Sequence, residues 1–276
     1  APSPDSPPQA RLDKDAFPEG LYAMTDRVAD LFVFQSMPPA KAMLRISRES
    51  LAELMEAGPR LPFHGDSLVA VLDPFYPEAD AAWLEEAVET LLEAGVRRFT
   101  ANNLGHFGLL RNKGLALASG EYLYAFNSWA AAQLRELGAA LLTAPLEISK
   151  QGLMRTLEPA ERSGAFVSLF AAPALFRMRA RLLSMHGQEE YASKEGEAYV
   201  LREGSAGSVL IPALPFSIVD RRAFLMEAGF RRFVLDFSYM GVKKPEYRGI
   251  MGAALSSSAL PGTTRFNWKD GFWSPD

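Results

Sequence analysis

"EAGVRRF" at residues 93–99 returns almost unchanged as "EAGFRRF" at 227–233, and a third relative, "ELGAALL", lies between them at 136–142. In each copy a glycine follows a helix-forming stretch, and glycine commonly ends helices because it adopts the left-handed conformation without strain. An apolar run typical of a buried strand comes next. We expect the arginines to lie at the solvent-exposed start of that strand. Each copy therefore indicates one return from helix to strand at the same end of a sheet.

The chain around these returns alternates between strand and helix patterns. Strands are predicted at "SLVAVLD" (67–73), "EYLYAFN" (121–127) and "AFVSLFAAP" (165–173), with helices over 78–94 and 128–137. Strands separated by helices of this length indicate βαβ units and a parallel sheet. Five or six such units favour an α/β fold of the (β/α) TIM-like barrel type, complete or incomplete, over an open doubly wound sheet. No GxGxxG motif follows a first strand, which weakens the dinucleotide-binding alternative.

The pattern changes near residues 187–212, where alternation and glycines predict a β-hairpin insertion. Four prolines in the first ten residues indicate that residues 1–18 form a linker or tail. The barrel domain is then expected over 19–260, and an aromatic tail over 261–276. This tail is suited to stacking bases or, as the commoner arrangement, to docking on the domain.

Composition excludes several classes of function. The net charge of −4 provides no basic footprint for duplex nucleic acid, and no apolar run is long enough to span a membrane. With no cysteine, the chain has no disulfide, thiolate metal site or cysteine nucleophile. Its three histidines lie far apart, so no metal site is expected. We expect a cytoplasmic protein, in the absence of a signal-peptide pattern.

In a (β/α) barrel, the side chains that follow the strands meet at one mouth. Carboxylates, carboxamides and guanidiniums at these positions suit a small polar or anionic ligand. Glu147 and Asp236 are the predicted catalytic residues, since carboxylates can move protons. The predicted substrate-binding residues are Asp73, Asn102, Asn103, His106, Tyr124, Asn127, Arg177 and Arg179.

Several of these residues have a structural alternative. Asn103 and Asn127 both precede helical segments and are suited to capping them. Asp73 precedes a proline turn, and Arg177 is equally suited to a surface salt bridge. The sequence alone leaves these alternatives open.

Two long phrases resemble the collagenase-like peptidase family (peptidase family U-32). They are "GEYLYAFNSWAAAQLRELGAALLTAPLEIS" (120–149) and "LPFSIVDRRAFLMEAGFRRFVLDFS" (214–238), the latter followed by "KKPEYRGIM" (243–251). The match covers roughly residues 67–257 and rests on the order and spacing of motifs. It implies the later part of a TIM-like barrel, in which Asn127 and Glu147 occupy the positions of motif residues.

The family is nominally proteolytic, and several members support hydroxylation of RNA bases or quinone precursors with an iron–sulfur cluster held by four cysteines. The segment "FVSLFAAPALFRMRARL" (166–182) stands where the first of these cysteines would be, and it contains none. The family's cluster is therefore not expected here, and no other cofactor is predicted.

Two hypotheses follow. In the first, the chain is a U-32-like enzyme domain, a hydrolase or peptidase or an enzyme modifying RNA or a small molecule. Glu147 would be its acid/base or anchoring carboxylate and Arg177 its anion clamp, while Asn102 and Asn127 would orient the substrate. In the second, the chain is a non-catalytic binding module of a larger U-32-type protein, with RNA or an upstream catalytic region as partner.

Overall fold

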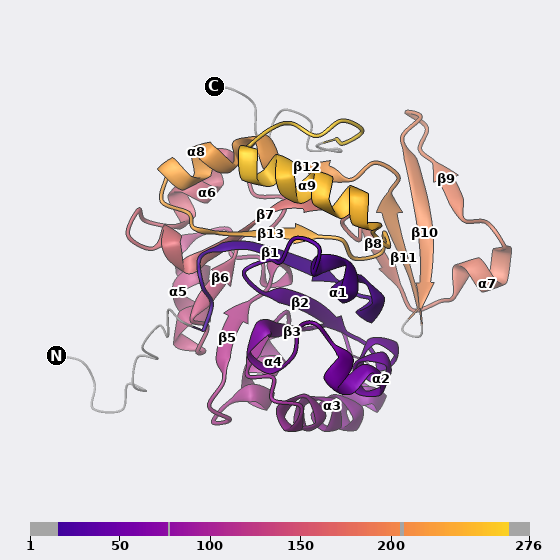
Figure 1. Ribbon diagram of the computed structural model, residues 1–276, viewed down its shortest axis with the longest axis horizontal. Helices are drawn as coiled ribbons and strands as arrows, with labels where there is room; N and C mark the ends of the chain where they lie inside the picture. The colour runs from indigo at the N-terminus through magenta and orange to yellow at the C-terminus, as the bar shows by residue number, and fades with distance from the viewer. Residues whose placement is uncertain (1–15, 77, 205–206, 265–276) are drawn as a thin grey trace.

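The computed structural model describes residues 16–76, 78–204 and 207–264. Its centre is a closed ring of eight parallel strands (Figure 1). They run in the order β7-β13-β1-β2-β3-β4-β5-β6, and β6 pairs with β7 to close the ring. The strands are β1 (Gly20–Thr25), β2 (Ala42–Ile46), β3 (Leu68–Leu72), β4 (Arg98–Ala101), β5 (Ala116–Ser119), β6 (Leu141–Thr143), β7 (Ala165–Ala171) and β13 (Arg232–Asp236). A short strand, β12 (Phe216–Ser217), pairs antiparallel with β7 outside the ring.

Each strand of the ring is followed by a helix of the barrel, although between β7 and its helix the chain also forms an insertion. These helices are α1 (Val28–Phe34), α2 (Arg48–Ala57), α3 (Ala81–Glu93), α4 (Leu104–Leu110), α5 (Ser128–Glu136), α6 (Lys150–Thr156), α8 (Arg222–Glu227) and α9 (Lys244–Ser256). The predicted (β/α) TIM-like barrel is confirmed, and the described residues complete all eight units.

Alternation along the strands produces two apolar layers, since successive side chains point to opposite faces. Tyr22, Met43, Val69, Phe166 and Val234 share one buried cluster, which lies inside the ring. The intervening residues join a larger cluster with the apolar faces of the helices. The barrel interior is thus a packed core among the described residues.

The repeated phrase performs the expected helix-to-strand return. Gly95, Gly138 and Gly229 have φ values of 83°, 110° and 106°, the left-handed region in which a side chain would be strained. The first arginine of each pair binds the carbonyls that end the preceding helix. Arg97 donates to Leu92 O at 2.6 Å, and Arg231 donates to Met226 O at 2.5 Å.

The expectation that both arginines of each pair lie at a solvent-exposed strand start is wrong for the second arginine. Arg232 is only 5% exposed and donates from Nε to Phe17 O at 2.6 Å. Arg98 donates to Ala16 O and forms an ion pair with Asp66. Burial of these guanidiniums is tolerated because backbone carbonyls accept their hydrogen bonds. Residues 16 and 17, predicted as part of a linker over 1–18, are buried and close the bottom of the barrel.

The predicted strand at 121–127 is wrong. The strand of this unit is β5, four residues of "ALAS" at 116–119, and it is followed by a 3₁₀ turn at Glu121–Leu123. The aromatic alternation in "YLYAF" resembles a half-buried strand, but Tyr124 and Phe126 are exposed on a loop at the barrel mouth. Tyr124 has a left-handed backbone (φ 49°) that no strand contains.

The predicted β insertion is confirmed and is larger than expected. It starts at β8 (Phe176–Met178) and continues through α7 (Leu182–His186), β9 (Glu190–Ala192), β10 (Ala198–Gly204) and β11 (Gly207–Pro212). These strands form an antiparallel sheet in the order β8-β11-β10-β9. Figure 1 shows this insertion sheet beside the barrel, on the side toward which β2 and β13 point. It therefore stands at the mouth.

Residues 1–15 and 265–276 lie outside the described residues, and with them most of the predicted linker and aromatic tail. Among the described helices, none has the length and apolar character required to cross a bilayer.

Candidate functional site

A buried arginine stands at the centre of the barrel mouth. Arg45, near the end of β2, donates from Nη2 to Asp236 Oδ2 at 2.7 Å and to Glu121 Oε1 at 3.2 Å. Its Nε donates to Ser238 Oγ at 2.9 Å. Asp236 is also held through Oδ1, which accepts from the Ser238 N–H at 2.9 Å. This predicted catalytic carboxylate is therefore engaged on both oxygens, as the partner of Arg45.

A second arginine joins the insertion sheet to the barrel. Arg177 on β8 donates to Asp73 Oδ2 at 2.9 Å, to Tyr239 Oη at 2.7 Å and to Tyr122 Oη at 3.3 Å. Its guanidinium lies 5.1 Å from the Tyr122 ring centre. Nearby phenols and Asp73 raise the pKa of Arg177 against the effect of its burial. Arg177, predicted as a free anion clamp, is thus a tie between the insertion and three segments that follow β3, β5 and β13.

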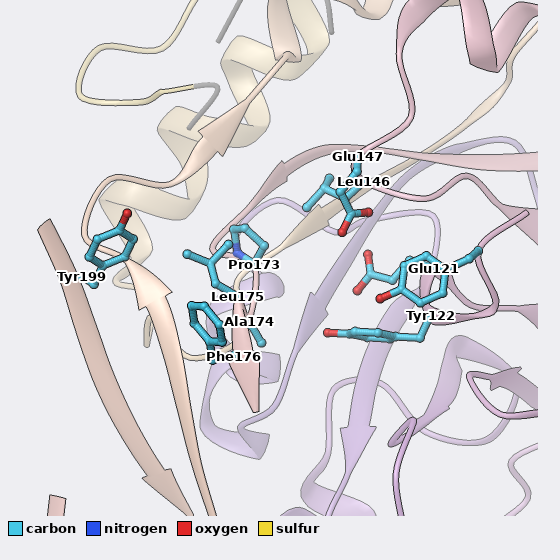
Figure 2. Close-up of a pocket in the computed structure, with 10 residues that line it drawn as sticks. Glu121, Tyr122, Leu146, Glu147, Pro173, Ala174, Leu175, Phe176 and Tyr199 are labelled. Atoms are coloured by element: carbon cyan, nitrogen blue, oxygen red, sulfur yellow. The ribbon is translucent and has the colours of Figure 1, made fainter. Parts of the chain in front are cut away.

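Beside this tie lies a cavity of about 420 Å³, which we call the acidic cavity. Figure 2 shows the carboxylates of Glu121 and Glu147 facing the same space, with Phe176 and Tyr199 of the insertion across from them. No lysine or arginine is among the described residues that line it. The lining residues are Glu121, Tyr122, Tyr124, Leu146, Glu147, Pro173, Ala174, Leu175, Phe176 and Tyr199.

The two carboxylates of the acidic cavity have different environments. Burial raises the pKa of Glu121, and the negative charges of Asp236 and Glu147 raise it further, while Arg45 opposes the shift. Glu147 is half-buried, and within the described part of the chain no hydrogen bond or ion pair holds its carboxylate. Its charge contributes to a raised pKa at Tyr124, where burial is the main cause. The cavity thus combines one restrained acid with one unrestrained acid.

A larger hollow of about 800 Å³ lies on the other side of Arg177, between α2, the end of β2 and the insertion sheet. Its charges are balanced. Arg179 lies over the Phe75 ring at 4.4 Å, and Asp73 and Arg177 neutralise each other on the wall. The charged lining residues are Arg27, Arg45, Arg177, Arg179 and Arg202 with Asp26, Glu49, Glu53, Asp73 and Glu203.

Two of the predicted substrate-binding asparagines act as helix caps. Asn103 Oδ1 accepts from Gly105 N at 2.8 Å at the start of α4. Asn127 Oδ1 accepts from Ala130 N at 2.9 Å at the start of α5. The capping alternative left open by the sequence is therefore what the side-chain oxygens do.

Asn102 and His106 are buried beneath the mouth. Asn102 Nδ2 donates to Leu72 O at 2.9 Å, while its Oδ1 is buried without a partner among the described residues, against Gly120, where any Cβ would collide with it. His106 Nδ1 accepts from the Asn102 N–H at 3.2 Å, and burial lowers its pKa to about 4. Neither residue lines the acidic cavity or the larger hollow.

The ten predicted residues are thus divided by the structure. Glu147 and Tyr124 line the acidic cavity, while Asp73, Arg177 and Arg179 line the larger hollow. Sequence reasoning missed Glu121, Tyr122, Arg45 and Tyr239. The misplaced strand at 121–127 concealed Glu121, which lies two residues after the true strand end at Ser119. A charged residue inside the apolar run "AMLRI" was the available signal for Arg45.

Among the described residues, no group of three or more histidine, aspartate or glutamate side chains is arranged to hold a metal ion. No family model and no curated protein matches the chain. Among solved structures, the spore cortex-lytic enzyme SleL of Bacillus cereus is similar with a TM-score of 0.42 and 8% identity, over 88% of this chain and 75% of that one. The C-terminal domain of a predicted chitinase from Desulfitobacterium hafniense follows, with a TM-score of 0.33 and 9% identity over 92% and 93% of the two chains. Likeness at this level supports no conclusion about function.

Proposed function

We propose that the chain is a hydrolase that cleaves a polar substrate in the acidic cavity with two carboxylates. The proposal rests on one observation: Glu121 and Glu147 face the same space from different environments. Two acids in different environments can act as a proton donor and a base in the same reaction. No further nucleophile is required for such chemistry.

In this reaction Glu121, whose pKa is raised by burial, donates its proton to the leaving oxygen or nitrogen of the substrate. Glu147 removes a proton from water as the water oxygen bonds to the electrophilic carbon, and the bond from that carbon to the leaving atom breaks. Arg45 fixes the side of the cavity from which the proton comes, since it holds Glu121 at 3.2 Å.

The charge of the acidic cavity bears on the earlier expectation of an anionic ligand. The unpaired carboxylate of Glu147 repels an anion, and no lysine or arginine is among the described residues that line the cavity, so the proposed substrate is neutral or cationic. Membership of peptidase family U-32, and a role in RNA modification, stay predictions from the sequence.

A second candidate is the non-catalytic binding module. The ion pair between Arg45 and Glu121 favours it, because a paired carboxylate is stabilised in its ionised form and is a poorer proton donor. The two candidates differ in whether the chain turns over a substrate, and in whether that turnover depends on Glu121 and Glu147.

The test is release of nitrophenol or nitroaniline from 4-nitrophenyl glycosides, esters and anilides by the full chain. For a substrate that is turned over, Glu121→Gln and Glu147→Gln should each lower kcat by about 10² to 10⁴-fold, as is usual for loss of an acid or base. Glu85→Gln, on the exposed face of α3, is the matched control and should leave kcat unchanged.

The pH dependence of kcat/KM provides a second readout. The proposal requires a basic limb that comes from Glu121, and Glu121→Gln should remove this limb. Turnover that survives both glutamine variants contradicts the proposal, and absence of turnover on the whole panel favours the binding module.

A further inference from the structure

Around the acidic cavity the loop "YLYAFNSW" (122–129) exposes an unusual number of aromatic rings. Tyr124 is 50% exposed and Phe126 45%, and the two rings are stacked nearly parallel, 6.0 Å apart at 8°. Phe176, on the opposite wall, is 62% exposed. Exposed aromatic surface gathered at a cavity, instead of scattered singly, is typical of a ligand-binding site.

The backbone of the loop holds these rings outward. Tyr124 lies in the left-handed region at φ 49°, which costs free energy for a residue with a bulky side chain. The Phe126 N–H donates to Tyr124 O at 2.8 Å, which closes a tight turn between the two rings. Their stacked arrangement is therefore set by the fold before any ligand arrives.

The arrangement distinguishes between possible ligands. Parallel rings that are about half exposed suit a flat ligand surface, whereas a small cation is best bound by rings that enclose it. A nucleic-acid base also has a flat face, but its phosphates would be repelled by the unpaired carboxylate of Glu147, and no described basic residue lines the cavity. A sugar ring offers apolar C–H groups to aromatic faces, and its hydroxyls donate to carboxylate oxygens.

We propose that the acidic cavity binds a neutral oligosaccharide, with one sugar ring against Tyr124 and its hydroxyls on Glu147 and Glu121. This inference rests on the proposed function for the cleavage step and names its substrate class. The bond cleaved is then the glycosidic C–O bond: Glu121 protonates the departing oxygen, and water adds to the anomeric carbon as Glu147 takes its proton.

The experiment is isothermal titration calorimetry and saturation-transfer NMR on the full chain. The probes are cello-, xylo-, malto- and chito-pentaose, with spermine and oligo-uridylate as competing ligand classes. At least one pentasaccharide should bind, and Tyr124→Ala should weaken that binding by about 3- to 10-fold, the loss expected for one aromatic contact. Phe176→Ala tests the opposite wall and should weaken it by a similar factor.

The matched control is Phe32→Ala, which removes a ring of similar exposure (44%) on α1 and should leave the affinity unchanged. Binding of none of the pentasaccharides, or binding that both cavity variants leave intact, overturns the inference. So does tighter binding of spermine or oligo-uridylate at the same residues.

Failure of this inference is distinguishable from failure of the proposed function. A pentasaccharide that binds and is not cleaved, as judged by chromatography of the mixture, contradicts the hydrolase and supports the ligand class. Cleavage of a non-sugar substrate that depends on Glu147, without sugar binding, supports the hydrolase and overturns the ligand class.

Discussion

At the bottom of the barrel, Arg98 and Arg232 donate to the backbone carbonyls of residues 16 and 17, whereas at the mouth Arg45 and Arg177 donate to carboxylates and phenols. Backbone carbonyls belong to a packed segment that fills the space, so the bottom is closed. Side-chain partners leave space between them, and the acidic cavity and the larger hollow lie there. The same residue type therefore seals one end and shapes a site at the other.

The difference predicts the largest loss of stability at the mouth. Arg45→Met leaves Asp236 and Glu121 buried beside each other without their cation, and breaking a buried ion pair from one side costs about 3–5 kcal/mol. Urea unfolding at pH 7 measures this free energy. Adding Asp236→Leu to the variant should recover part of the loss, and a double variant less stable than Arg45→Met contradicts this account.

Acid sensitivity should also come from the mouth end. The pKa of His106 is lowered by burial to about 4, so the folded state binds its proton more weakly than the unfolded chain does. The neutral His106 therefore contributes fully to the free energy of unfolding above pH 6.5. This contribution is lost as the pH falls from about 6.5 to about 4, by up to about 3 kcal/mol. His106→Gln removes the titration and keeps an acceptor for the Asn102 N–H. Its unfolding free energy should fall less than that of the wild type between pH 7 and 4, and an equal fall would assign the acid sensitivity elsewhere.

At the bottom the expected effect is smaller. Arg232→Met removes the hydrogen bonds to Phe17 O and Ser163 O and should lower the free energy of unfolding by about 2 kcal/mol. The loss is smaller than at Arg45 because an unsatisfied buried carbonyl costs less than an unpaired buried charge. Arg231→Met, the neighbour that caps the end of α8, is the matched control and should cost under about 1 kcal/mol. A loss at Arg232 that exceeds the loss at Arg45 would reverse the comparison between the two ends.

The sequence predicted the alternating helices and strands of the barrel well because the helix-to-strand return is repeated along the chain. Gly95, Gly138 and Gly229 occupy one backbone conformation that glycine alone adopts cheaply, so their spacing revealed the βαβ units. The mouth has no such repetition. Its ion pairs join residues distant in the chain, such as Arg45 with Asp236 and Arg177 with Asp73, and no local pattern specifies them.

The error at β5 has a physical cause. Strand β5 is only "ALAS", four residues without an aromatic or β-branched side chain, whereas the loop after it alternates aromatic and aliphatic residues as a half-buried strand does. Burial favours aromatic residues in strands, and ligand contact favours them on loops, so composition cannot separate the two. Asn127 was ambiguous for a similar reason, because a cap and a ligand contact require the same side-chain oxygen.

The hydrogen bonds at both ends of the barrel also fix the order in which the chain can fold. Arg232 reaches Phe17 across 215 positions of sequence, and Arg45 reaches Asp236 across 191. Both closures await β13, so neither end can be completed until residues 232–236 have left the ribosome. Contacts between residues so far apart in the sequence slow folding. During synthesis one edge of strand β1 stays unpaired until β13 has been made.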